Sequence, residues 1–292
     1  HAMNYRITHR TTYEYAEPVA VSHHAARVEP RVTAVQSRTD WRIAISPEPA
    51  VQVQRPDFFG NRVCFFAIQE LHAKMEVTAT SVVSVEERDV PAPALSEPWE
   101  QVAQRYRDPV AGAAIGPFQF VFGSPLVQPR PEFADYARES FPAGRPLLAA
   151  VADLNRRIHA DFAYDPVATT TATPLAEVWE KRRGVCQDFA HFAIACLRSL
   201  GLPASYVSGY LRTLPPAGKP RLVGADATHA WFSVHCPNFG WVDFDPTNNC
   251  QPSGEHITVA FGRDFSDVSP VMGILTGGGS HTVKVSVDVE PL

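Results

Sequence analysis

Residues 182–200, RRGVCQDFAHFAIACLRSL, contain the change from loop to helix around which we expect half of the chain to fold. Six apolar side chains recur at helical spacing: Phe189, Phe192, Ala193, Cys196, Leu197 and Leu200. This period is typical of an amphipathic helix that packs one face on a core. Gly201 and Pro203 follow as a helix stop. The stretch therefore predicts a packed helix that begins close to Cys186.

The segments on both sides of this helix combine helical and strand patterns. Upstream, apolar residues at helical spacing predict a helix over residues 146–162. Downstream, residues 204–210, 230–235 and 241–245 have the composition of strands. Alternating valines near the end of the chain predict one more strand. We therefore expect an α+β domain over residues 132–292 that includes this C-terminal strand.

The first part of the chain has a different period. At residues 5–15 the odd positions are tyrosine, isoleucine, histidine or threonine, and the even positions are arginine, threonine or glutamate. A period of two is typical of a strand with one buried face. Shorter repeats of this pattern follow, separated by proline, glycine or asparagine. An antiparallel, β-sandwich-like domain is expected over residues 3–90.

Proline makes up 26 of the 292 residues, and eight of these prolines fall in residues 91–131. Proline lacks the amide donor that helix and sheet interiors need. We therefore expect a connector over residues 91–131, with one possible short helix at residues 99–106.

The overall composition is that of an ordinary globular protein, with 45% apolar residues and a formal net charge of −5. Mild acidity argues against a nucleic-acid partner, which calls for a basic surface. No apolar run approaches the roughly 20 residues of a membrane span. No apolar export segment follows Met3, and five cysteines without a Cys-x-x-Cys pair fit a reducing compartment. We expect a cytoplasmic protein with no nucleic-acid or membrane partner, and the sequence predicts no oligomeric state.

Cys186 is the first candidate for chemistry. If the helix begins here, free amides and the positive end of the helix dipole favour a thiolate. Arg182 and Arg183 add positive charge, and Gly184 permits a tight entry into the helix. The alternative is a small buried side chain, the interpretation that suits Cys196 on the apolar stripe. Cys186 differs because its neighbours are largely polar.

A thiolate nucleophile needs a base, and His229 with Asp245 is the candidate pair. Residues 236–240 contain proline, asparagine and glycine, so the flanking strands should form a hairpin. If His235 lies opposite Trp241, or if the register is two residues tighter, the pair shares one face. The carboxylate can then orient the imidazole and stabilise its charged form. A slip of one residue would separate the pair and leave both as surface strand residues.

A metal site is not predicted. His229 and His235 lie six residues apart, about 20 Å along one strand, which is too far to share an ion. A set that includes Cys250 has no zinc-ligand spacing. His191 and His256 have no evident partners, and we interpret His191 as structural. We expect neither a metal nor another cofactor.

Three motifs in chain order are GVCQDFAH at residues 184–191, DATHAW at 226–231 and GWVDFDPT at 240–247. Together they resemble the transglutaminase-like superfamily. Four further segments resemble the bacterial branch of this superfamily, whose members have an N-terminal β domain. These segments are residues 27–31, 57–61, 206–210 and 260–270. The resemblance spans nearly the whole chain. It implies a papain-like α+β core and a catalytic triad of Cys186, His229 and Asp245.

The chemistry that the resemblance implies is acyl transfer on a peptide or protein substrate that carries an amide. The Cys186 thiolate attacks the carbonyl, His229 protonates the leaving amine, and a thioester remains. The oxyanion is expected to bind the Cys186 amide and a second donor, either Tyr164 or Gln187.

Hydrolysis is the expected outcome, as in a peptidase or amidase. The alternatives are a true transglutaminase, in which an amine accepts the acyl group, and a catalytically silent interaction module. Arg263 and Asp264 lie in the segment at residues 260–270, which resembles the family. We expect these two residues to brace the loop after Thr247 rather than to line the active site.

Overall fold

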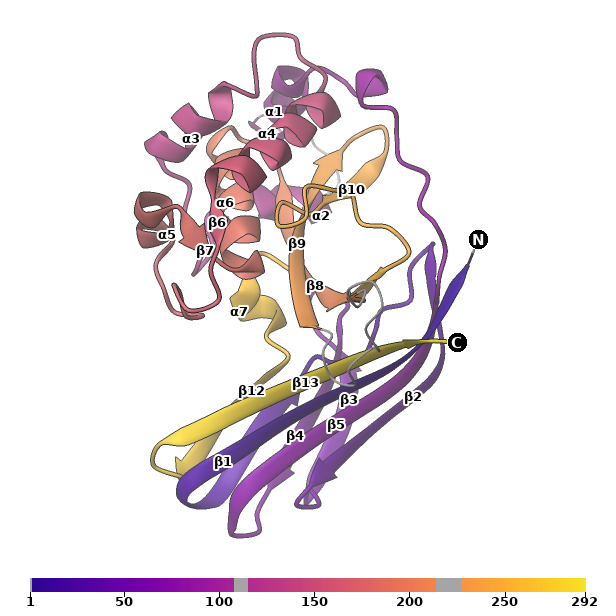
Figure 1. Ribbon diagram of the computed structural model, residues 1–292, viewed down its shortest axis with the longest axis vertical. Coiled ribbons are helices and arrows are strands. Elements are labelled where there is room, and N and C mark those ends of the chain that lie inside the picture. Colours follow the sequence, from indigo (N-terminus) through magenta and orange to yellow (C-terminus); the bar gives the residue numbers. More distant parts are fainter. Residues whose placement is uncertain (1, 108–114, 214–226) are drawn as a thin grey trace, which may run out of the picture.

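The computed structural model describes residues 2–107, 115–213 and 227–292. Asp226 of the second motif and Pro109 of the proline-rich segment therefore lie outside the described residues. Figure 1 shows a core of helices and strands above a broad antiparallel sheet, with both ends of the chain in that sheet. The α+β class expected from the sequence is confirmed.

The lower layer is a seven-stranded antiparallel sheet centred on β1. Its strands are β1 (Met3–Ala26), β2 (Gln36–Ser46), β3 (Val51–Pro56), β4 (Arg62–Ile68), β5 (His72–Val85), β12 (Val271–Gly277) and β13 (His281–Pro291). The first half of β1 lies between β5 and β13, and its second half lies between β4 and β12. The antiparallel β region expected at the start of the chain is confirmed, as one continuous sheet.

The two C-terminal strands belong to this lower sheet. The first half of β1 pairs residue by residue with β13, from Tyr5 opposite Pro291 to Tyr15 opposite His281. The expectation that the C-terminal strand is part of a domain at residues 132–292 is therefore wrong. The alternating valines indicate a strand, but a local pattern carries no information about which strand pairs with it.

The alternating pattern of β1 has a direct structural cause. Tyr5, Ile7 and His9 are buried on the side that faces the core, whereas Arg6 and Arg10 are exposed. Tyr5 and Ile7 join the main apolar core together with Val287 and Val289 of β13. This part of the lower sheet therefore shares a core with the upper layer, whereas Val19, Phe66 and Met75 belong to a second apolar cluster within the sheet.

The upper layer contains a four-stranded antiparallel sheet in the order β10-β9-β8-β11. The strands are β8 (Ala204–Leu211), β9 (Ala227–Cys236), β10 (Gly240–Phe244) and β11 (His256–Gly262). The helices are α1 (Trp99–Arg107), α2 (Ile115–Phe118), α3 (Pro131–Arg138), α4 (Leu147–Asp161), α5 (Leu175–Lys181), α6 (Cys186–Ser199) and α7 (Phe265–Val268). Helix α6 packs on β8 and β9, and α3, α4 and α5 contact α6. The helices predicted at residues 146–162 and after Cys186 are confirmed.

The described part of the proline-rich segment is structured. It contains α1, as the sequence predicts, and two short 3-10 helices at Pro93–Leu95 and Gln119–Val121. Val102 of α1 and Val127 are fully buried in the main core. This connector is therefore packed against the upper layer.

Side-chain amides join the two layers along the edge of β11. Gln36 of β2 donates to the carbonyl of Thr258 and accepts from its amide, both at 2.8 Å. Asn61 does the same with Phe261, at 2.7 and 2.8 Å. These side chains satisfy backbone groups that a neighbouring strand would otherwise pair. They fix the lower sheet relative to β11.

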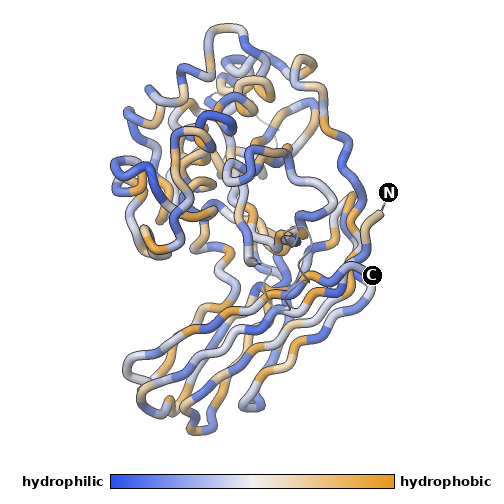
Figure 2. Tube along the Cα trace, viewed as in Figure 1, coloured by the Kyte–Doolittle hydropathy of each residue, from blue (hydrophilic) through white to orange (hydrophobic). Residues whose placement is uncertain are grey.

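Apolar residues are distributed in short segments throughout the chain. Figure 2 shows hydrophobic and hydrophilic segments alternating along the strands of the lower sheet and along the helices. Among the described residues, no helix has the length and apolarity needed to cross a membrane.

Candidate active site

Cys186 is the first residue of helix α6, as the sequence predicts. The buried carboxylate of Asp188 accepts from the Val185 amide at 2.8 Å and from the Thr169 hydroxyl at 2.6 Å. Gly184 leaves room for this carboxylate, since a Cβ there would lie 2.5 Å from Asp188 Oδ2. The loop thus enters the helix tightly and leaves Cys186 half-buried with its amide in the first turn.

The hairpin of β9 and β10 has the register that brings the proposed pair together. Trp241 lies opposite His235, and Phe244 lies opposite Phe232. This is one of the two registers for which the sequence predicts that the pair shares a face. His229 Nε2 lies 2.7 Å from Asp245 Oδ2, so the predicted proximity is confirmed.

Asp245 is completely buried and accepts hydrogen bonds on both carboxylate oxygens. Oδ1 accepts from the amides of Thr247 and Asn248 at 2.9 and 3.2 Å. Oδ2 accepts from the Asn248 side-chain amide at 2.7 Å in addition to His229. The carboxylate therefore has a fixed orientation toward the imidazole.

A second histidine, which we did not predict from the sequence, also contacts Asp245. His256 Nε2 lies 3.0 Å from Asp245 Oδ2, and the Ser253 amide donates to His256 Nδ1 at 3.4 Å. Because Nδ1 accepts, Nε2 carries the proton and donates to the carboxylate. The expectation that His256 has no partner is wrong. It lies on β11, two strands away from His229 in the sheet, and only the strand order would have revealed the contact.

Trp231 packs against both histidines. Its ring is perpendicular to that of His256, at a centroid distance of 5.3 Å, and its centroid lies 6.0 Å from that of His229. Gly209 of β8 makes space for this ring, since a Cβ there would lie 2.5 Å from Trp231. The residue pair Gly209 and Trp231 thus holds an apolar surface against the histidines.

The electrostatics of the pair favour a charged imidazole and a charged carboxylate. Burial alone would lower the pKa of His229, but the hydrogen bond to Asp245 and the adjacent Cys186 raise it to about 10. Burial would raise the pKa of Asp245, but hydrogen bonds from His229 and His256 hold it well below its usual range. Since Nε2 of His229 faces Asp245, Nδ1 is the nitrogen available to Cys186.

Cys186, Gln187 and His229 line one side of a cavity of about 530 Å³. Tyr164, the other predicted oxyanion donor, lies opposite Gly184 in the short parallel pairing of β6 (Ala163–Tyr164) with β7 (Arg183–Gly184) and is 58% exposed. Burial and the nearby Cys186 raise its pKa. The roles of Tyr164 and Gln187 at the oxyanion stay predictions.

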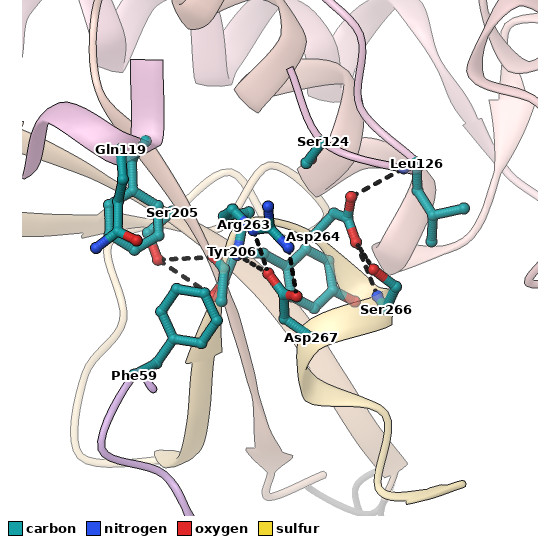
Figure 3. Close-up of polar contacts among 12 residues, drawn as sticks. Phe59, Gln119, Ser124, Leu126, Ser205, Tyr206, Arg263, Asp264, Ser266 and Asp267 are labelled. Carbon is teal, nitrogen blue, oxygen red and sulfur yellow. Dashed lines mark hydrogen bonds and ion pairs between the residues drawn. The ribbon is translucent and has the colours of Figure 1, made fainter. Parts of the chain in front are cut away.

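Arg263 and Asp264 have a bracing role, as preferred from the sequence, but the segments that they contact are helix α7 and Leu126 and not the loop after Thr247. Figure 3 shows the Arg263 side chain directed at Asp267, which it contacts at 2.9 and 3.0 Å. Asp264 accepts from the amides of Ser266 and Leu126, each at 2.8 Å. These contacts fix helix α7, whose first residue, Phe265, lines the cavity.

The other cysteines and histidines divide as follows. All five cysteines are free, in line with the expectation of no disulfide framework. Cys196 is buried in the core. The interpretation of His191 as structural is supported, because its Nε2 accepts a hydrogen bond from the Phe265 amide at 3.1 Å.

His229, Asp245 and His256 offer ligand atoms within 4.8 Å of one another, so their spacing would allow a metal ion. Their mutual distances of 2.7 and 3.0 Å are those of hydrogen bonds.

Comparisons with known sequences agree with this architecture. The family model for the bacterial transglutaminase-like N-terminal region matches residues 5–84, and the model for the transglutaminase-like superfamily matches residues 134–246. An uncharacterized protein of Mycobacterium tuberculosis is 40% identical over 298 residues, which cover 98% of this chain and 92% of that protein. The chain belongs to the transglutaminase-like superfamily. This is the family that the three motifs resemble, so that prediction is confirmed.

Two further comparisons concern a solved structure with the same fold and a relative that matches part of the chain. A candidate cysteine protease from Cytophaga hutchinsonii has the same fold, with a TM-score of 0.76 at 21% identity over 100% of this chain and 91% of that one. A protein-glutamine gamma-glutamyltransferase of Pseudomonas aeruginosa is 35% identical over 122 residues, which cover 41% of this chain and 18% of that protein. Membership of the transglutaminase-like superfamily supports cysteine-dependent acyl transfer in general.

Proposed function

We propose that this protein hydrolyses peptide or side-chain amide bonds through a thioester on Cys186. The observation that carries the proposal is the alignment of three groups. Cys186 begins helix α6 beside His229, and His229 is hydrogen-bonded at 2.7 Å to the buried Asp245.

The geometry supports a definite sequence of steps. The Cys186 thiolate attacks the amide carbonyl, and the helix N-terminus offers its free amides to the developing oxyanion. The proton on His229 Nδ1 passes to the leaving nitrogen as the carbon–nitrogen bond breaks, which releases an amine and leaves a thioester. Neutral His229 then takes a proton from water, which attacks the thioester and restores the thiol with release of the acid. Asp245 orients the imidazole and stabilises its charged form throughout.

Two features of the cavity favour water over an amine as acceptor. Cys186 is half-buried, so that solvent reaches the sulfur and would reach a thioester formed on it. Among the described residues that line the cavity there is no aspartate or glutamate, so no carboxylate there would attract a lysine ammonium group from solvent.

Amine transfer is the second candidate, because the Pseudomonas aeruginosa relative is named as a protein-glutamine gamma-glutamyltransferase. The two activities share the thioester and differ only in the group that attacks it. The same experiment therefore separates them.

The test is incubation of the protein with a diverse peptide mixture, with and without a primary amine, followed by mass spectrometry. Hydrolysis gives cleaved peptides or deamidated glutamines in both conditions, and Cys186→Ala gives neither. Amine adducts with negligible free acid would instead establish the transferase. No product, together with slow alkylation of Cys186 by iodoacetamide at neutral pH, would contradict both and favour an interaction module.

Cys250→Ala is the matched control for the alkylation. Cys250 is also half-buried, but burial and the nearby Asp245 raise its pKa to about 11. Iodoacetamide at pH 7 should therefore modify Cys186 in the wild type and in Cys250→Ala, and should leave Cys186→Ala almost unmodified.

A further inference from the structure

One wall of the Cys186 cavity comes from the other layer of the molecule. Six residues of the lower sheet line it: His9, Thr11, Tyr13, Val271, Val283 and Val285. We call them the sheet wall. The first three lie on β1, and Thr11 and Tyr13 are directly opposite Val285 and Val283 in the pairing with β13. Cys186 and His229 line the same cavity from the upper layer.

The sheet wall is uncharged. No lysine, arginine, aspartate or glutamate lines the described part of the cavity. His9 bonds to the Tyr210 hydroxyl at 2.8 Å and to the Thr11 hydroxyl at 2.9 Å, and burial lowers its pKa to about 4. His9 is therefore neutral at pH 7. An ionised substrate group placed here would lose water without gaining a counter-ion on the wall.

The sheet wall is also held at a fixed distance from Cys186. The bond between His9 and Tyr210 joins β1 directly to β8. The amide pairs of Gln36 and Asn61 fix the same sheet to β11. Substrate selection by a wall requires such rigidity, because a mobile wall would move away from an unfavourable group.

We propose that the sheet wall selects the substrate: it accepts an uncharged, apolar side chain next to the amide under attack and rejects acidic and basic ones. The proposal rests on the proposed function of Cys186. It gives the N-terminal region, together with the two C-terminal strands, a role in specificity.

Electrophilic peptides test the proposal without requiring turnover. Dipeptidyl chloromethyl ketones alkylate cysteine by forming a carbon–sulfur bond with loss of chloride. A series that differs only in one side chain, leucine, phenylalanine, aspartate or lysine, is reacted with the full-length protein. Each inactivation rate is divided by the iodoacetamide rate of the same protein, which reports on the nucleophile alone. We expect the apolar reagents to react at least tenfold faster than the charged ones.

Charged substitutions in the sheet wall should reverse this preference. Val285 is 54% exposed, so Val285→Glu and Val285→Lys are compatible with folding. We expect Val285→Glu to slow the apolar reagents about tenfold and to accelerate the lysine reagent, and Val285→Lys to favour the aspartate reagent. Val51→Glu is the matched control, because Val51 is 53% exposed on β3 of the same sheet and lines a different pocket.

The outcomes separate this proposal from the proposed function. If iodoacetamide and all peptides fail to alkylate Cys186 at neutral pH, the nucleophile is refuted and the sheet-wall proposal fails with it. If alkylation is fast but apolar and charged peptides react equally, only the sheet wall is refuted. The same conclusion holds if the Val285 variants keep the wild-type preference or behave like Val51→Glu.

Discussion

Replacing Asp245 with asparagine should abolish the charged imidazole of His229. Burial lowers the pKa of His229, and the hydrogen bond to Asp245 and the adjacent Cys186 raise it to about 10. Asparagine keeps the shape of the side chain but removes its charge. Burial, the largest single influence, is then opposed by Cys186 alone, and we expect the pKa of His229 to fall toward the ordinary histidine value of 6.5.

The magnitude follows from the two pKa values. A fall from about 10 to 6.5 is a change of about 3.5 units, which corresponds to about 5 kcal/mol at ~1.36 kcal/mol per unit. His229 is only 8% exposed, so solvent screens the interaction little. Since the folded-state pKa is raised, this stabilisation is fully present below pH 6.5 and is lost as the pH rises through about 10.

Two measurements check this prediction. The imidazole Cε1–H signal of His229, assigned by comparison with His229→Gln, gives its pKa in the wild type and in Asp245→Asn. Urea unfolding at pH 6 and pH 10.5 gives the stability, which should decline much more over this range in the wild type than in Asp245→Asn. Asp267→Asn is the control, because Asp267 pairs with Arg263 and not with a histidine. A His229 that still titrates near pH 10 in Asp245→Asn would refute the reasoning.

Two further substitutions probe the groups around this pair. His256→Phe removes one hydrogen-bond donor to Asp245 and should lower kcat, or the alkylation rate of Cys186, about tenfold with little change in KM. His256→Gln retains a donor and should recover most of the lost rate. Equal losses in both variants would contradict a role through that hydrogen bond. Gly209→Ala should destabilise the protein by about 1–3 kcal/mol in urea unfolding, because the added Cβ would lie 2.2 Å from the Ile257 carbonyl oxygen and 2.5 Å from the Trp231 ring. Gly116→Ala, with no atom within 4 Å, should have almost no effect.

The sequence was most informative where one local pattern determines the structure. The alternation at the start of the chain predicts the buried face of β1, and the apolar stripe after Cys186 predicts helix α6. The hairpin expected around residues 236–240 puts His229 and Asp245 on one face in either of two registers, and the structure has one of these two.

The features missed from the sequence depend on pairing between distant segments. His256 reaches Asp245 only because β11 joins the sheet beside β8, and β13 reaches the cavity only because it pairs with β1. The hydrophobic pattern of β11 does not indicate that it pairs with β8, and the pattern of β13 does not indicate that it pairs with β1. Strand order, and with it the sheet wall, therefore had to come from the structure.

The position of β1 between segments from both ends of the described chain has a consequence for folding during synthesis. β1 can pair with β5 early, but the other edge of its first half stays open until β13 has been made. Contacts of such large sequence separation are expected to form slowly, and an unpaired strand edge is prone to association with other chains. The nascent chain would therefore be vulnerable to aggregation through β1 until β13 has left the ribosome.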